Sequence, residues 1–176
     1  NRLLRPTLGW RWIAEEAEGG VDRDLAEAPP ASRIELTCRA TPGRIETEAR
    51  ILVVDGDQMI RGVDIGLVTP GLAPNAWRFF DAATAEEIRP EPLAPAQRTS
   101  VGLGGRGPAW HLSLPTPQRG RVTILARHAA SWPGRGDLPL LEVPNRFHWR
   151  GELIILSARD LLTSVRPRAT RTLDPE

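Results

Sequence analysis

Residues 33–54 read RIELTCRATPGRIETEARILVV, and this stretch decides the fold. On both sides of Pro42 and Gly43, apolar side chains stand at every second position, which is the period of a strand with one buried face. Pro-Gly is a turn dipeptide, so the two halves are predicted to pair as neighbouring antiparallel strands.

The same cadence continues to Val165. Short runs rich in Ile, Val, Leu and Thr alternate with Gly, Pro, Asp or Asn at the spacing of an all-β protein. We therefore predict an antiparallel β-sandwich of about eight to ten strands, immunoglobulin-like or jelly-roll in style. The predicted sandwich domain covers residues 33–165.

Glycine-containing segments predict where individual strands end. The segment 55–57, Asp-Gly-Asp, is expected to close a hairpin, because Asp-Gly is a strong hairpin signal. The segment 118–120, Gln-Arg-Gly, is expected to separate a strand that ends at Pro115 from a strand over residues 121–128.

The middle of the chain is predicted to hold shorter strands. Residues 77–80 and 86–89 are expected to form a hairpin, and residues 99–103 a short strand. The proline-rich segment 90–95 indicates a connection across an edge of the sheet, because proline cannot donate to a central ladder.

The two ends of the chain differ from this pattern. Residues 1–32 are predicted to form an N-terminal arm with one or two short helical turns, whose Trp10 and Trp12 dock on the main domain. Residues 166–176 are predicted to be an extended tail. The sequence begins with Asn1 rather than Met, so we expect a mature product or a piece of a longer protein.

Composition excludes several classes of protein. All 23 basic residues are arginines, they are scattered, and 22 acidic residues offset them to a net charge of +1. A nucleic-acid-binding protein usually shows a clustered basic excess, so we expect no nucleic-acid partner. The absence of lysine is typical of a GC-rich bacterial coding bias. No apolar run approaches the roughly 20 residues that span a bilayer.

Neither a cofactor nor a metal site is predicted. Cys38 lies in the apolar alternation and is expected to be a small buried side chain. The three histidines lack the close spacing of zinc ligands, and His111 and His148 fall on polar strand faces as solvated residues. A glycine-rich segment at 102–107 is followed by proline and a strand pattern instead of a helix, which indicates an inter-strand loop and not a phosphate loop.

No motif for catalysis stands out either. The chain has no G-x-S-x-G elbow, and its paired carboxylates at 55–57 and 86–87 are turn residues. We therefore expect a protein without catalytic residues, with a hydrolase whose site is built from loops as a distant alternative.

The candidate ligand-binding residues are Trp132 and Arg135, within the loop Ser-Trp-Pro-Gly-Arg-Gly at 131–136. A loop tryptophan beside arginine can stack on a sugar ring or anchor a protein partner, although Trp132 could equally cap the end of the sandwich. Trp110 and Trp149 have the parity of core residues.

These observations lead to a functional hypothesis. We expect a non-catalytic binding or structural module of a larger bacterial surface or envelope protein, located outside the cytoplasm, with a protein or a glycan as its partner. The alternative is a carbohydrate-binding module that uses exposed tryptophan and arginine.

Overall fold

The computed structural model describes residues 5–13, 31–68, 77–103, 107–132, 138–144 and 148–157. In chain order the elements are β1 (Arg5–Ile13), β2 (Ala31–Thr41), β3 (Gly43–Leu67), β4 (Trp77–Asp81), β5 (Glu87–Ile88), β6 (Pro90–Pro92), α1 (Pro95–Ser100), β7 (Ala109–Trp132), β8 (Leu141–Glu142) and β9 (His148–Ser157). The prediction of an all-β protein is confirmed.

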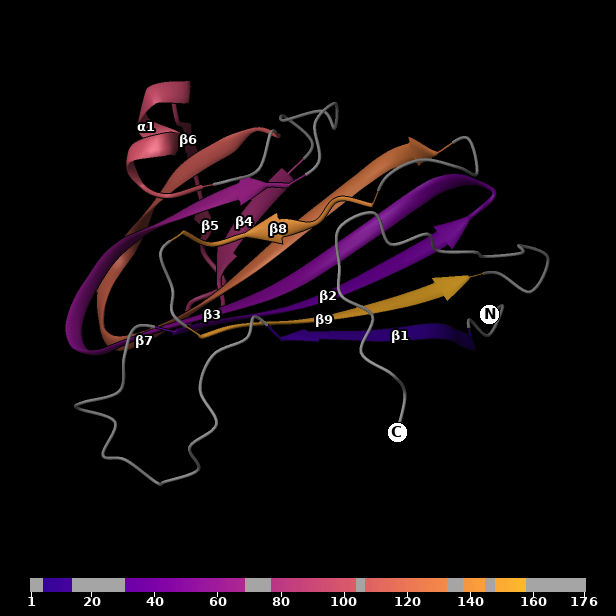
Figure 1. Cartoon of the computed structure of the whole chain (residues 1–176), viewed down its shortest axis with the longest axis horizontal. Coiled ribbons are helices and arrows are strands. Elements are labelled where there is room, and N and C mark those ends of the chain that lie inside the picture. The colour runs from indigo at the N-terminus through magenta and orange to yellow at the C-terminus, as the bar shows by residue number, and fades with distance from the viewer. Residues whose placement is uncertain are drawn as a thin grey trace.

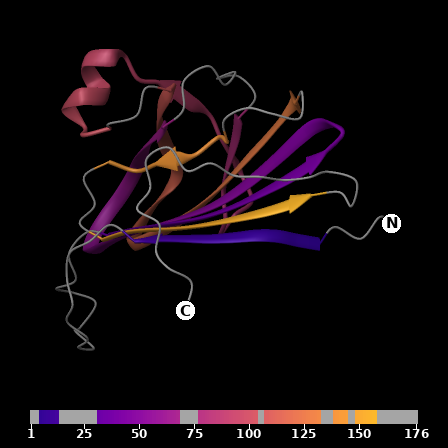
Figure 2. The same cartoon turned by 45° about the vertical axis from the view of Figure 1, so that its right-hand side comes forward.

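The strands follow the order β1-β9-β2-β3-β7-β4-β5, while β6 pairs with β7 and β8 pairs with β3. All of these pairings are antiparallel except that between β2 and β9. The two longest strands, β3 and β7, pair with each other along their lengths and curve back together at one end of the molecule (Figure 1). Their curvature folds one continuous sheet into the two layers of a sandwich, which the rotated view also shows (Figure 2).

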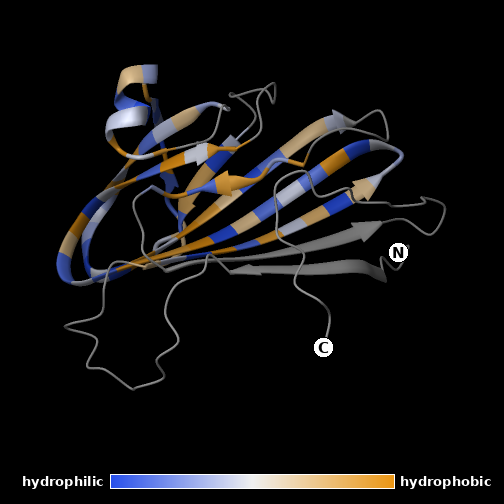
Figure 3. Ribbon diagram, in the orientation of Figure 1, coloured by the Kyte–Doolittle hydropathy of each residue, from blue (hydrophilic) through white to orange (hydrophobic). Residues whose placement is uncertain are grey.

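The core lies between these layers and follows the predicted alternation. Along β2 and the first half of β3, buried apolar residues alternate with exposed or half-exposed ones, as the hydropathy colouring shows (Figure 3). Residues from the second half of β3 and from β4, β5, β7 and β8 complete the core. Its largest fully buried side chains include Ile34, Leu36, Ile51, Ile65, Leu67, Phe79, Leu112, Ile124 and Leu141. The predicted burial of Cys38 and Trp110 is confirmed, with 0% and 3% of each residue exposed.

The turns expected at 55–57 and 118–120 are wrong, because both strands run through them. The register between β3 and β7 shifts between Val54 and Met59, so the ladder is interrupted there but not ended. Gly56 and Gly120 both have positive φ angles, 49° and 74°. A β-carbon at Gly120 would lie only 2.6 Å from the carbonyl oxygen of Gly56. The two glycine signals therefore belong to one shared bend in the sheet.

The expected end of a strand at Pro115 is also wrong. β7 continues past this residue, which lies at a second register shift, between Ile60 and Gly62 of β3. A proline is tolerated there because the interrupted ladder does not need its missing N–H.

In the middle of the chain one prediction is confirmed and another is wrong. The hairpin over 77–80 and 86–89 appears as β4 and β5, paired through Phe79 and Ile88. The expected strand at 99–103 is absent, and α1 occupies residues 95–100 instead. Proline suits the first turn of a helix, and the Gln97 side chain accepts a hydrogen bond from the Ala94 N–H at 2.8 Å. The segment before it forms the edge strand β6, which pairs with β7.

Part of the predicted N-terminal arm belongs to the described residues. Residues 5–13 form strand β1, which pairs with β9, so this part has no helical turns. Residues 14–30 and 158–176 lie outside the described residues, so the helical turns expected before Arg33 and the extended tail stay predictions. The division into an arm, a sandwich domain and a tail stays a prediction. No helix in the described part of the chain is long and apolar enough to cross a membrane.

Candidate functional site

Three polar side chains lie in one row across neighbouring strands β3, β7 and β6. His111 of β7 is the register partner of Asp64 on β3 and of Glu91 on β6. The His111 Nδ1 atom lies 2.7 Å from Asp64 Oδ1, and the two side chains remain 40% and 23% exposed. This distance is that of a hydrogen bond, whose donor and acceptor depend on the tautomer of the imidazole.

Gly62 makes room for the imidazole. A β-carbon at this position would lie 2.7 Å from both Cε1 and Nε2 of His111. The Nε2 edge of the ring therefore rests against Gly62, while Nδ1 faces Asp64. The orientation of the ring is set by the glycine on one side and by the carboxylate on the other.

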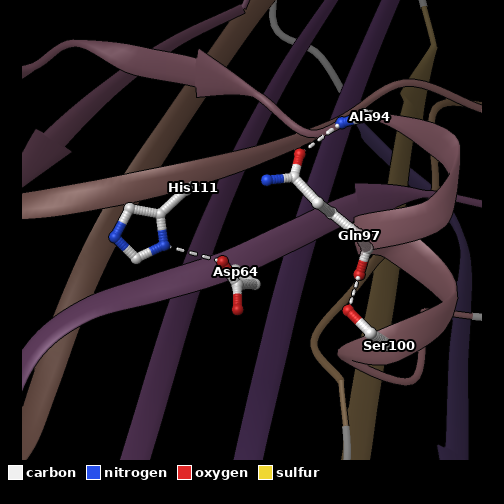
Figure 4. A network of polar contacts seen from close by, with 5 residues as sticks. All are labelled: Asp64, Ala94, Gln97, Ser100 and His111. Atoms are coloured by element: carbon white, nitrogen blue, oxygen red, sulfur yellow. Dashed lines mark hydrogen bonds and ion pairs between the residues drawn. The ribbon is translucent and has the colours of Figure 1, made fainter.

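Helix α1 forms the opposite wall of this site (Figure 4). Gln97 turns its side chain back to cap Ala94, and the Ser100 hydroxyl donates a 2.8 Å hydrogen bond to the Gln97 carbonyl. Together the row and the helix border an open groove of about 440 Å³. Its lining residues are Asp64, Glu91, Pro92, Leu93, Gln97, Ser100, Val101 and His111.

The arrangement is suited to binding more than to nucleophilic catalysis. The Ser100 hydroxyl donates its hydrogen bond to a backbone carbonyl, and the Nε2 edge of His111 is packed against Gly62. A serine nucleophile needs its hydroxyl bonded to the imidazole of its base, which this groove does not provide. Across the described part of the chain, no group of three or more His, Cys, Asp or Glu side chains could hold a metal ion.

The groove has a distinct charge. Its described lining residues include two carboxylates and no arginine, although the chain contains 23 arginines. Elsewhere in the sheet, arginines instead form ion pairs with glutamates, as Arg78 of β4 does with Glu87 of β5 and Arg127 of β7 with Glu48 of β3. The hydrogen bond from Arg78 holds the pKa of the Glu87 carboxyl below its usual value.

A second polar row lies on the buried face. Cys38, Thr47, His128 and Trp77 are successive register partners across β2, β3, β7 and β4. The Cys38 Sγ atom lies 3.8 Å from Thr47 Oγ1, and burial raises the pKa of the thiol to about 11. His128 stacks on Trp77 with ring centroids 4.9 Å apart. This row is hidden from solvent, so it is not part of the groove.

Of the residues predicted from sequence to bind a ligand, only the backbone of Trp132 belongs to the described part of the structure. Trp132 is the last residue of β7, where its backbone pairs with Gly43, and Arg135 lies outside the described residues. Their role stays a prediction, as does the predicted core position of the Trp149 side chain. His111 does lie on the polar face of its strand, as expected, but its contact with Asp64 was missed. Only the register of β3 against β7 reveals this contact.

Comparison with known proteins adds little. No protein-family model matches the chain, and no curated protein matches it. Among solved structures, it is similar to a mutant M1 zinc metallopeptidase from Deinococcus radiodurans crystallised with a bound substrate. That match has a TM-score of 0.32 and 14% identity, and it covers 66% of this chain and 24% of the peptidase chain. A TM-score this low supports no argument about fold or activity.

Proposed function

We propose that this chain is a non-catalytic binding module of a larger bacterial surface or envelope protein, and that its groove holds a cationic side chain of a protein partner. The observation that carries the proposal is the row of Asp64, His111 and Glu91, which lines a groove with no arginine among its described lining residues. The extracytoplasmic location is part of the same proposal, and its support is the frequent use of β-sandwiches as interaction modules at cell surfaces.

The carboxylates are placed to receive a cation. Within the described part of the chain, His111 is the only polar partner of the Asp64 side chain, and Glu91 has none. Acceptor capacity therefore remains on both side chains. A guanidinium or ammonium group between them would form charge-assisted hydrogen bonds, which are stronger than neutral ones and directional for arginine.

The surrounding groups favour a side chain over a free ion. Pro92, Leu93 and Val101 supply apolar contact surface, against which the methylene stem of arginine or lysine could pack. Because His111 holds one oxygen of Asp64, the carboxylate needs little reordering when a cation arrives. Preorganisation of this kind raises affinity by lowering the entropy lost on binding.

The test compares argininamide with citrullinamide, which has nearly the same shape but no charge, in an NMR titration of the ¹⁵N-labelled protein. We expect argininamide to shift the resonances of Asp64, Glu91 and His111, and citrullinamide to leave them unchanged. Asp64→Asn and Glu91→Gln should each weaken argininamide binding by about tenfold, the scale of one charge-assisted hydrogen bond. Glu86→Gln, an exposed carboxylate in the β4–β5 turn, is the matched control and should have no effect.

Two outcomes would contradict the proposal. Equal binding of citrullinamide would show that charge is not recognised. Shifts of the groove resonances by a neutral oligosaccharide, with none by argininamide, would favour the carbohydrate-binding alternative instead.

A further inference from the structure

His128 is a buried histidine without a hydrogen-bond partner. Only 3% of the residue is exposed, and neither ring nitrogen forms a hydrogen bond with any residue of the described chain. The indole Nε1 of Trp77, on which the imidazole stacks, is buried and unpaired as well. Buried polar atoms nearly always have partners, so three unpaired ones in adjacent rings mark an unusual place in this core.

The described neighbours of His128 carry no charge. Its register neighbours are Thr47 on β3 and Trp77 on β4, and the residues next to it on the inward face of β7 are Ala126 and Ala130. The only titratable side chain in its row is the Cys38 thiol, which burial keeps protonated. The other buried ionisable side chain in the described core is Asp81, at the far end of β4 beside Ile124.

A proton on His128 would therefore have no counter-ion among the residues that the structure describes. Removing a charged side chain from water has a large free-energy cost even after the protein relaxes, whereas stacking of a cation on tryptophan contributes only a small stabilisation. The desolvation cost exceeds the stacking energy, so burial lowers the pKa of His128 from its usual value. In mild acid, His128 binds a proton in the unfolded or opened chain but stays neutral in the closed chain. Acid therefore favours opening.

The end of β4 that carries Trp77 is paired on one side only, with β7, in the described part of the chain. Trp77 is the first residue of β4, and β5 pairs only with Phe79 and Phe80 of that strand. Nothing in the described part of the chain pairs with the outer edge of β4 at Trp77. Separation of this end from β7 would give His128 access to water while the rest of the sheet stays paired.

We propose that His128 is an acid-sensitive latch, and that uptake of a proton by its imidazole releases the N-terminal end of β4 from β7. The released state exposes the Trp77 indole and the backbone edge of β7 around His128. This switch is independent of the cation-binding groove, because it involves the opposite face of the sheet.

The experiment is amide hydrogen exchange on the full chain at pH 7.5 and pH 5.0, corrected for the intrinsic rates. If the opened state has an ordinary histidine pKa of about 6.5, its population should rise by up to about 30-fold over this range. We expect the amides of β4 to lose protection by this factor, and the amides of β2 to lose much less. His128→Phe keeps a ring to stack on Trp77 but cannot titrate, so the pH effect on β4 should disappear. His111→Gln should retain it.

A second variant and a direct probe keep the proposal falsifiable if His128→Phe does not fold. His128→Gln must also lose the pH effect, and the Hε1 resonance of His128 in the wild type must titrate together with β4 protection. Retention of the full pH effect in either variant would overturn the latch. So would titration of His128 near pH 6.5 with β4 still protected.

Discussion

The Cα atom of Gly120 faces the carbonyl oxygen of Gly56 so closely that a β-carbon on Gly120 would lie 2.6 Å from that oxygen. This contact joins β7 to β3 at the bend where the sheet passes from one layer to the other. Both glycines have positive φ angles, which side chains disfavour. The architecture therefore depends on two residues that contribute no side chain to the core.

Gly120→Ala is expected to destabilise the protein by about 3 kcal/mol, because left-handed backbone strain and the clash with Gly56 add. Gly43→Ala is the matched control, since Gly43 has a similar φ of 78° but nothing within 4 Å of its missing β-carbon. Its loss should be about 1 kcal/mol. Denaturant midpoints measure both, and equal losses would show that the close approach contributes nothing.

Gly62→Ala is expected to weaken argininamide binding several-fold without altering either carboxylate. The new methyl group would occupy the place of the His111 ring edge, and the imidazole could then no longer hold the Asp64 oxygen. NMR titration with argininamide measures the affinity, and His111 resonances report the displacement of the ring. An unchanged affinity with a displaced ring would show that His111 does not help to position Asp64.

The sequence was enough to predict which face of each strand is buried. It was not enough to predict which residues of neighbouring strands lie opposite each other. Alternation in 33–54 correctly identified the buried positions, because side-chain direction in a strand depends only on local geometry. The Asp-Gly signal at Gly56 was misread because a hairpin and a bulge both need a residue with positive φ. Likewise, Asp64 and His111 meet only through the register of two strands far apart in sequence.

Asp81→Ala is expected to destabilise the protein by about 3 kcal/mol, because it leaves two hydrogen-bond donors without their acceptor. The Asp81 carboxylate is fully buried and accepts hydrogen bonds from the Ala83 N–H at 2.8 Å and from the Gln118 side chain at 2.7 Å. Gln118→Ala removes only one of these and should cost about 1 kcal/mol. Urea midpoints of the two variants test this order, and a larger loss for Gln118→Ala would contradict it.

The Cys38 thiol is expected to resist a thiol-specific chromogenic reagent in the native protein at pH 8. With its pKa raised to about 11 by burial, almost none of it is the reactive thiolate at that pH, and the side chain has no solvent access. Unfolding in guanidinium should expose one reactive thiol per chain. Rapid labelling without denaturant would show that β2 opens easily at this position.

Trp132→Ala distinguishes a contact residue from a cap on the core. If Trp132 binds the partner, stability should stay nearly unchanged while binding weakens by about 2 kcal/mol. If it caps the sandwich, the fold should lose about 3 kcal/mol. Denaturant midpoints decide between the two, and a large fall would remove Trp132 from the binding surface.

The position of β9 has a consequence for how the chain folds. β9 lies between β1 and β2, so the first of the described strands joins the sheet only through the last of them. As the chain is synthesised, β1 has no neighbour to join, and the edge of β2 stays open until residues 148–157 have emerged. Pairing between such distant segments is slow, and an open edge invites aggregation while it lasts. The sheet is therefore expected to grow outward from β2, β3 and β7, with β9 and then β1 added last.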